Sequence, residues 1–343
     1  MNRKKKALGF EINPTDSVVY SSFNPSIKKW NSLTARRCED KNFWPSPFSS
    51  GLNYGLAVFE GMKAFRHKDG KIYIFRPHHH ARRFIGSLKG LSMPPFPTEK
   101  FTEAVKRLVY INAKFVPEYR QGSLYIRPIA WGDKNLGFGH NPNLAYTAAF
   151  QCSPVGLYYT GDLKSIAVYI MREMTRAMPG GLGYCKVAGN YEISRMAKVI
   201  ADKHGCGDAL FLDGKTKTHI EEFGAANVFV VKNDALYTPP PSDTILSGIT
   251  RKSIITLAKS VLRLKIYEQD IRVKDVTKMA DEVFACGTAV AITPVGQIRD
   301  GKTIYTIGDG QTGQITKKLY DLLTGVQYGD IKDKFGWMEE VEK

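Results

Sequence analysis

The stretch Lys186-Val187-Ala188-Gly189-Asn190-Tyr191 places a lysine shortly before a tyrosine, and Glu222 follows downstream. Lysine is the one side chain that forms a stable imine with the aldehyde of a cofactor such as pyridoxal phosphate, and a carboxylate is what a pyridinium nitrogen needs opposite it. The three residue types together predict a pyridoxal-phosphate site. A lysine before Gly-Asn-Tyr is, taken alone, more often a surface residue, so the prediction depends on the rest of the chain.

Phosphate recognition is the second requirement of such a site, because backbone N–H groups at a helix start or tight turn, together with a cation, hold a phosphate. The run Leu246-Ser247-Gly248-Ile249-Thr250-Arg251 leads into a helix expected over 250–262, which places amides and the Thr250 hydroxyl at its N-terminus. A second small-residue turn is Cys286-Gly287-Thr288-Ala289. Either turn alone is more typical of an ordinary loop. Arg83 is the candidate cation, and a solvated helix residue is the alternative.

A substrate carboxylate has candidate partners in Tyr125-Ile126-Arg127. Strand side chains alternate between faces, so Tyr125 and Arg127 share one face, and an arginine beside a phenol suits a carboxylate. The alternative is a strand whose polar residues simply face outward. Three aromatic residues are expected either to form an apolar side-chain pocket or to be plain core: Tyr54, Phe59 and Tyr158.

Hydrophobic periodicity and turn residues predict an α/β fold class of the α+β type with mixed sheets. A hairpin is expected over 59–75, with its turn at Lys68-Asp69-Gly70. Helices are expected over 77–91, from 98 onward, over 191–204 and over 250–262. The further expected strands are 123–130, 145–152, 166–171, a pair within 209–231, 264–271 and a final strand region over 282–294.

The length of 343 residues suggests one large or two medium domains. A polar, glycine-containing segment follows Pro154-Val155-Gly156 and suits an interdomain linker. We therefore predict a small N-terminal α/β domain over 1–153, a linker over 154–165 and a larger C-terminal domain over 166–343 that binds the cofactor.

Composition limits the possible partners. The formal net charge is +16, but the basic residues are dispersed and no nucleic-acid motif stands out, which favours anionic small molecules. A basic nucleic-acid-binding protein remains the alternative from another class. No apolar run approaches the roughly 20 residues that span a bilayer, so no membrane is expected. The five cysteines are scattered without a Cys-x-x-Cys pair, which favours a reducing cytoplasm.

Two other motifs carry no site prediction. His78-His79-His80 are consecutive, so a helix would distribute them around its surface instead of aiming them at one ion, and no metal is expected. Gly180-Gly181-Leu182-Gly183 is not a Gly-x-Gly-x-x-Gly sequence and lacks the strand–turn–helix context of a dinucleotide site.

These residues fall into an ordered series of motifs over nearly the whole chain. The series runs through Tyr54-Gly55, Phe59 to Arg66, Tyr125 to Pro128, Lys186 to Tyr191, Glu222 to Asn227, Leu246 to Arg251, Gly287-Thr288-Ala289 with Pro294-Val295, and the tail at Trp337. In this order the motifs resemble those of the branched-chain amino acid aminotransferases, which are fold-type IV (class IV) pyridoxal-phosphate enzymes. The resemblance implies a homodimer whose cofactor lies in a cleft between a small and a larger domain.

The resemblance also implies roles for single residues. Lys186 would be the Schiff-base lysine that moves the proton between the substrate Cα and the cofactor C4′. Glu222 would pair with the pyridine nitrogen and Tyr191 with the phenolic oxygen. The phosphate would be held by Arg83, Ile249, Thr250 and Thr288. The substrate would be contacted by Tyr54, Phe59, Tyr125, Arg127, Tyr158 and the amides around Thr288 and Ala289.

The expected activity is reversible amino transfer between L-leucine, L-isoleucine or L-valine and 2-oxoglutarate. Ala225 and Ala226 are small where some relatives have bulkier residues, so the pocket could admit larger side chains. Another class IV enzyme therefore stays open, either an aminotransferase for aromatic or specialised amino acids or an aminodeoxychorismate lyase. A non-catalytic cofactor-binding scaffold is a further alternative.

Overall fold

The computed structural model describes residues 8–40, 45–134, 145–156 and 163–342. The chain divides into two compact units, of which the first comprises residues 1–160 and 326–343 and the second comprises 161–325. The sequence-based boundary differs at the C-terminal end, because residues 326–343 join the first unit. The first two residues of the expected linker, Pro154 and Val155, belong to a strand.

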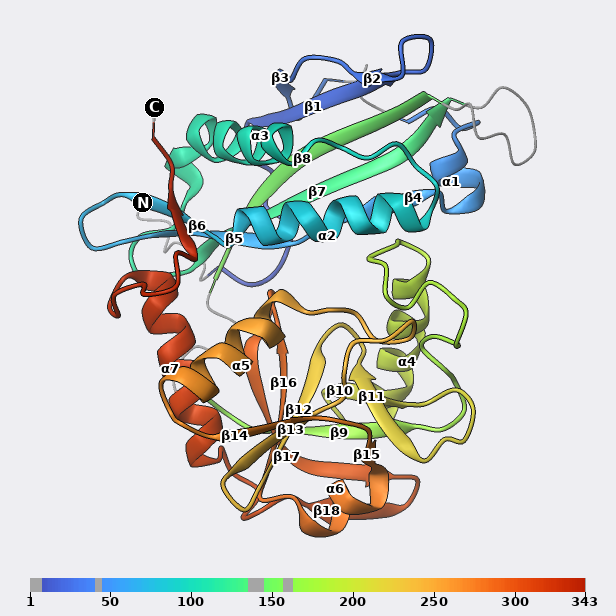
Figure 1. Ribbon diagram of the computed structural model, residues 1–343, viewed down its shortest axis with the longest axis vertical. Coiled ribbons are helices and arrows are strands. Elements are labelled where there is room, and N and C mark those ends of the chain that lie inside the picture. The colour runs from blue at the N-terminus through green and yellow to red at the C-terminus, as the bar shows by residue number, and fades with distance from the viewer. Residues whose placement is uncertain (1–7, 41–44, 135–144, 157–162, 343) are drawn as a thin grey trace, which may run out of the picture. The chain divides into compact units, whose positions relative to one another are not determined.

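The first unit contains a nine-stranded sheet in which every pairing is antiparallel (Figure 1). Its order is β19-β6-β5-β7-β8-β1-β2, with β3 paired to β1 and β4 paired to β7. The strands are β1 (Ser17–Asn24), β2 (Lys29–Trp30), β3 (Thr34–Arg37), β4 (Ala57–Phe59), β5 (Met62–Arg66), β6 (Ile72–Phe75), β7 (Ser123–Lys134), β8 (Ala145–Val155) and β19 (Met338–Glu340). The helices are α1 (Ser50–Tyr54), α2 (Pro77–Gly90), α3 (Thr98–Ile111) and a 3-10 turn at Ala113–Phe115.

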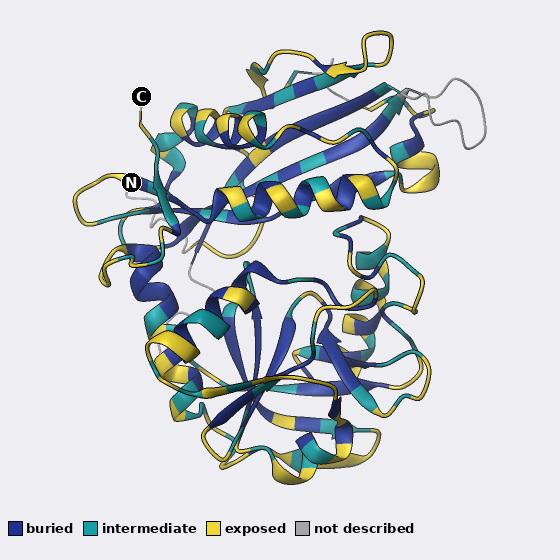
Figure 2. Cartoon of the chain, viewed as in Figure 1, coloured by how far each residue is buried: buried dark blue, intermediate teal, exposed yellow. Residues whose placement is uncertain are grey.

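Helices α2 and α3 alternate buried and exposed residues along their length, as amphipathic helices on a sheet do (Figure 2). Phe84 of α2 contacts Phe101 of α3 with ring centroids 5.3 Å apart, and Phe101 contacts Phe150 of β8 at the same separation. All three rings are fully buried. The aromatic contacts therefore join both helices to β8, and α2 carries the candidate phosphate ligand Arg83.

The C-terminal segment closes the edge of this sheet. Strand β19 pairs antiparallel with β6, and the Arg76 amide donates to the Trp337 carbonyl at 2.6 Å. The Arg76 guanidinium also lies 4.9 Å from the centre of the Trp337 ring. These contacts explain why the last residues belong to the first unit.

The second unit contains a ten-stranded sheet ordered β14-β13-β12-β16-β17-β9-β10-β11-β15, with β18 paired to β17. Its strands are β9 (Ile166–Met171), β10 (Asp208–Leu212), β11 (His219–Phe223), β12 (Asn227–Lys232), β13 (Ala235–Thr238), β14 (Lys265–Glu268), β15 (Ile271–Arg272), β16 (Glu282–Gly287), β17 (Ala291–Asp300) and β18 (Thr303–Thr306). The helices are α4 (Asn190–Lys203), α5 (Ile249–Ser260), α6 (Val273–Met279) and α7 (Gln314–Tyr328), of which the residues from Val326 on belong to the first unit.

Mixed pairing is confined to this second sheet, where β9 runs parallel to β10 and β17, and β13 runs parallel to β14. The expected α/β fold is thus confirmed, while the expectation of mixed sheets holds for the second unit only, because the strand pairings described for the first sheet are all antiparallel. The expected strand pair within 209–231 is wrong, because that segment forms β10, β11 and β12. Across the described residues, no helix is long and apolar enough to cross a membrane.

Candidate active site

Lys186 is positioned by the loop before α4. The side-chain Nδ2 of Asn190, at the start of α4, donates to the Leu182 carbonyl at 2.7 Å and to the Cys185 carbonyl at 3.3 Å. These two hydrogen bonds hold the glycine-containing loop against the helix. Tyr191 is therefore held in the first turn of α4, beside the lysine. The Lys186 Nζ donates to the Tyr191 Oη at 2.5 Å and lies 4.6 Å from the ring centre.

Glu222 lies at the buried end of β11, with 3% of its surface exposed. The Asn227 Nδ2 donates to Oε1 at 2.5 Å, and the Leu246 amide donates to Oε2 at 3.3 Å. Burial raises the pKa of Glu222 to about 7, while the charges of Arg176 and, more weakly, Lys186 oppose that rise. Glu222 is consequently a buried carboxyl group whose ionisation depends on nearby positive charge.

Asn227 connects the two candidate phosphate turns to Glu222. It pairs in register with Glu222 across β11 and β12 and with Cys286 across β12 and β16. A Cβ on Gly248 would lie only 1.8 Å from the Asn227 Oδ1, so the start of α5 passes directly against this residue. A Cβ on Gly287 would lie 3.4 Å from the Ala225 carbonyl, which places Gly287, the residue before Thr288, beside the turn that leads into β12.

Helix α5 offers a suitable start for binding a phosphate. Its N-cap is Gly248, and within the described part of the chain no side chain caps the helix. Ile249 and Thr250 follow as the first two helical residues and are buried. Helix N-termini attract anions through their unpaired amides and the helix dipole. Thr288 and Ala289 lie half-buried in the turn between β16 and β17.

These residues fit pyridoxal phosphate. Each carboxylate oxygen accepts up to two hydrogen bonds. The Glu222 Oε1 accepts one, from Asn227, and therefore has an acceptor position for a pyridinium N–H. The second unit thus holds a lysine–tyrosine pair, a buried carboxylate and an uncapped helix start. The predictions for Lys186, Tyr191, Glu222, Ile249, Thr250, Thr288 and Ala289 all fall within this one compact unit.

The carboxylate candidates lie on the sheet of the first unit. The Arg127 Nη2 donates to the Tyr125 Oη at 3.2 Å, as expected for two residues on one strand face. The Arg127 guanidinium also lies 4.8 Å from the centre of the Phe59 ring. Arg127 Nε is buried and, among the described residues, has no hydrogen-bond partner. Tyr125, Arg127 and Phe59 therefore form one contiguous group with hydrogen-bonding capacity to spare.

Arg83 takes part in a buried ion pair. Its Nε donates to the Glu60 Oε1 at 2.6 Å and its Nη2 donates to Oε2 at 2.9 Å, while the His80 Nδ1 lies 2.8 Å from Oε2. Burial raises the pKa of Glu60, but Arg83 and His80 outweigh it and hold the pKa well below its ordinary value. The interpretation of Arg83 as a solvated helix residue is wrong, and its role as a phosphate ligand stays a prediction.

The other residues named from the sequence include two tyrosines and two alanines. Tyr54 ends α1 with 47% of its surface exposed, and Tyr158 lies outside the described residues. Ala225 is exposed in the turn between β11 and β12, whereas Ala226 packs against the core of the second unit.

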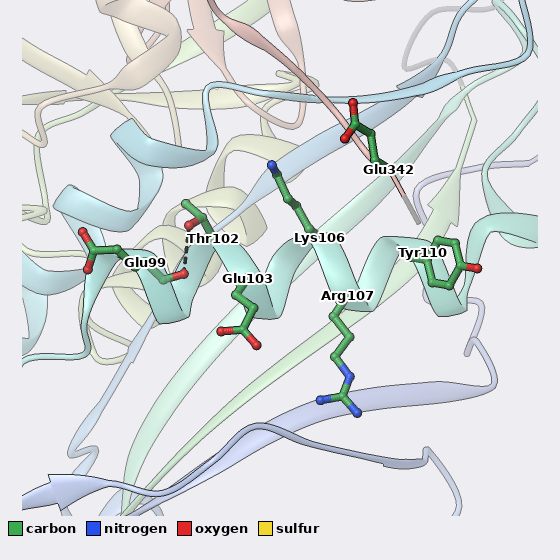
Figure 3. A pocket seen from close by; sticks show the side chains of 7 residues that line it. All are labelled: Glu99, Thr102, Glu103, Lys106, Arg107, Tyr110 and Glu342. Atoms are coloured by element: carbon green, nitrogen blue, oxygen red, sulfur yellow. Dashed lines mark hydrogen bonds between the residues drawn. The ribbon is translucent and has the colours of Figure 1, made fainter.

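A surface depression along α3 contains none of the predicted site residues and is lined by Glu99, Thr102, Glu103, Lys106, Arg107, Tyr110 and Glu342 (Figure 3).

Each unit also contains a residue that contacts one of the candidate residues but had no role in the sequence-based prediction. Arg176 pairs with Glu222, and Gly61 borders Tyr125 so closely that a Cβ would lie 2.1 Å from the Tyr125 Oη. Gly61 lies within the quoted Phe59 to Arg66 motif, which was a signal that the position matters. Arg176 offered no comparable local signal, because its partner is far away in the sequence.

The chain matches a known protein family over most of its length. Residues 57–298 match the model of the family described as amino-transferase class IV. A probable branched-chain-amino-acid aminotransferase of Staphylococcus epidermidis is 41% identical over 304 residues, which cover 87% of this chain and 84% of that protein.

Solved structures of similar proteins extend the match. A branched-chain amino acid aminotransferase of Escherichia coli has a TM-score of 0.81 at 28% identity, covering 96% of this chain and 100% of that one. The branched-chain amino acid aminotransferase of Thermobaculum terrenum, solved in its PLP form, has a TM-score of 0.80 at 27% identity, covering 96% of this chain and 99% of that one. The resemblance inferred from the motifs is confirmed: this chain belongs to the class IV aminotransferases and, among them, to the branched-chain amino acid aminotransferases.

Proposed function

We propose that this protein is a pyridoxal-phosphate-dependent transaminase that transfers the amino group of L-leucine, L-isoleucine or L-valine to 2-oxoglutarate. The observation that carries the proposal is the Lys186–Tyr191 hydrogen bond beside the buried Glu222 carboxylate, in a chain of this family. When bound, pyridoxal phosphate supplies the aldehyde and the electron-withdrawing ring that this exchange requires.

The residues proposed to hold the cofactor have separate tasks. Lys186 is the attachment point and the base that takes the proton from the substrate Cα. Tyr191 orients the lysine amine through their 2.5 Å hydrogen bond and is the partner for the phenolic oxygen. Glu222 holds the proton on the pyridine nitrogen. Arg83 and the backbone amides and hydroxyls of Ile249, Thr250 and Thr288 bind the phosphate, because a phosphate requires both cations and N–H donors.

Tyr125 and Arg127, together with amides near Ala289, bind the substrate carboxylates. One pocket must accept an apolar side chain in one half-reaction and the distal carboxylate of glutamate in the other. The Arg127 guanidinium over the Phe59 ring suits both substrates. The arginine binds a carboxylate, while the ring contributes apolar surface for a side chain. Tyr54 and Tyr158 complete the proposed aromatic wall.

Assembly and location are also proposals. We propose a homodimer in the cytoplasm, without nucleic acid or membrane partners. The five cysteines, all of which carry free thiols, support the reducing compartment. A sedimentation or light-scattering measurement of the purified protein tests the dimer directly.

The half-reaction tests the proposed function. The visible absorption spectrum of the protein loaded with pyridoxal phosphate should change to that of the pyridoxamine form when L-leucine is added without any oxo acid. Addition of 2-oxoglutarate should then restore the first spectrum. D-Leucine is the matched control and should leave the spectrum unchanged.

The alternative activities would give different results when other substrates are tested. Conversion by an aromatic amino acid, with no response to leucine, would move the substrate class away from branched chains. Release of pyruvate from aminodeoxychorismate would indicate lyase chemistry. A protein that shows no cofactor band after incubation with pyridoxal phosphate would refute the proposed role of Lys186.

Substitution of Gly61 tests the proposed substrate site. In Gly61→Ala the new Cβ would lie 2.1 Å from the Tyr125 Oη, so the phenol must move. We expect kcat/KM to fall by about 10- to 100-fold, since displacements near 1 Å have such effects on catalysis. The measurement is steady-state kinetics with leucine and 2-oxoglutarate.

Gly86→Ala is the matched control for this prediction, because a Cβ at Gly86 of α2 meets nothing within 4 Å. It should retain wild-type kinetics. Equal kinetics in the two glycine variants would show that the position of Tyr125 does not matter for substrate binding.

A further inference from the structure

Arg176 lies between β9 and the loop that leads to Lys186, and 7% of its surface is exposed. Its Nη1 forms an ion pair with the Glu222 Oε2 at 2.7 Å and also donates to the Thr244 carbonyl at 3.1 Å. The family resemblance assigned no role to this residue. Its contact with the carboxylate expected to face the cofactor suggests that it acts on the cofactor through Glu222.

The hydrogen bonds to Glu222 determine which of its oxygens can meet a further donor. Arg176 and the Leu246 amide both contact Oε2 and so fill its two acceptor positions. Oε1 receives only the Asn227 amide and retains one position. Arg176 therefore fixes the rotation of the carboxylate, with Oε1 as the oxygen that accepts an additional N–H.

The charges around Arg176 also favour a further cation beside Glu222. Glu221 and Glu222 are both buried, and burial raises the pKa of each, while the charge of Arg176 lowers both. Glu221 is held by the Thr244 hydroxyl, which donates to its Oε1 at 2.6 Å. Arg176 thus supplies one positive charge for two buried carboxyl groups, with a weaker contribution from Lys186 at Glu222, and a pyridinium on Oε1 would add positive charge beside them.

We propose that Arg176 is a positioning residue that keeps Glu222 ionised, so that the proton shared with the cofactor resides on the pyridine nitrogen. An arginine carries a permanent positive charge, which stabilises the adjacent carboxylate anion. Without that charge the Glu222 carboxylate becomes a stronger base than the pyridine nitrogen, and the proton moves from the ring nitrogen to Oε1. The ring then withdraws electrons less strongly. The inference rests on the proposed cofactor and on the proposed role of Glu222.

The protonation of the ring nitrogen can be measured directly. Pyridoxamine 5′-phosphate labelled with ¹⁵N in the ring is bound to the wild-type protein and to Arg176→Met, and its nitrogen chemical shift is recorded. We expect a pyridinium shift in the wild type and a shift toward neutral pyridine in Arg176→Met. In steady-state kinetics, kcat should fall in this variant while KM for leucine changes little.

Matched variants separate the effect of losing the charge of Arg176 from the effect of disturbing the structure around it. Arg172→Met, four residues earlier, removes an exposed arginine that pairs with Asp300, and it should give the wild-type shift. Arg176→Lys keeps the charge and should restore the pyridinium shift. If circular dichroism shows that Arg176→Met does not fold, Arg176→Gln takes its place, because glutamine keeps hydrogen-bonding capacity without the charge.

The outcomes distinguish this inference from the proposed function. A pyridinium shift that persists in the folded Met or Gln variant would overturn the role of Arg176 and leave the cofactor assignment intact. Failure of the wild-type protein to bind labelled pyridoxamine 5′-phosphate would instead refute the proposed cofactor site. A neutral-pyridine shift already in the wild type would also overturn the inference, because Arg176 would then not keep the proton on the ring.

Discussion

Replacement of Lys186 by alanine is expected to abolish transamination, with kcat lower by at least about 10⁴-fold. Lys186 has two proposed tasks, attachment of the cofactor and proton transfer at the substrate Cα, and alanine performs neither. The 2.5 Å hydrogen bond to Tyr191 shows that the amine is already oriented by its neighbour. Tyr191 cannot replace it, because a phenol does not form an imine.

Steady-state turnover and covalent labelling of the cofactor site check this prediction. Borohydride treatment of the wild-type protein loaded with cofactor should fix the cofactor on the peptide that contains Lys186, as detected by mass spectrometry, and no such peptide should appear for Lys186→Ala. Lys203→Ala, at the exposed end of α4, is the control and should behave as wild type. Appreciable turnover by Lys186→Ala would eliminate the lysine assignment.

Replacement of Glu222 by glutamine is expected to lower kcat by about 10²- to 10³-fold, the usual cost of removing one preorganised electrostatic partner. Glutamine retains the size of the side chain but carries no charge to stabilise a pyridinium. The matched control is Glu192→Gln on α4, whose carboxylate is exposed and pairs with Arg195. A Glu222→Gln enzyme with wild-type kcat would show that ring protonation does not depend on this residue.

The same substitution should change how the stability of the cofactor-free protein depends on pH. The pKa of Glu222 is raised from its ordinary value of 4.5 to about 7, so the folded state binds this proton more tightly than the unfolded state. The resulting stabilisation is complete below pH 4.5 and is lost as the pH rises through 7. Urea unfolding of wild type and Glu222→Gln across this range should show the wild type losing stability relative to the variant.

Local sequence signals predicted much of the fold. The turn at Lys68-Asp69-Gly70 does join β5 and β6, and Pro77 does begin α2. The strand predicted over 166–171 has the bounds of β9. These elements are governed by side-chain periodicity and by turn residues, both of which are visible within a few positions. The three-stranded arrangement over 208–232 was missed, because the turn that separates β11 from β12 lies within a short run of small residues.

The candidate site residues also fall into those that local sequence reveals and those that it does not. Lys186, Tyr191 and Glu222 could be named from the residue types that the chemistry demands. Arg176 could not, because it meets Glu222 only after β9 and β11 come together with β10 between them in one sheet. The dependence of Tyr125 on Gly61 likewise arises from the packing of β5 against β7. Contacts between residues far apart in sequence leave no periodic signal in either segment.

The pairing of β19 with β6 has a consequence for biosynthesis. A ribosome must release residue 340 before the first unit can complete its sheet, whereas residues 161–325 emerge earlier as an uninterrupted segment. Domains generally fold as units while the chain is being made, and pairing of segments distant in sequence is slow. The second unit can therefore fold first, while the edge strand β6 of the first unit stays unpaired until β19 has been synthesised.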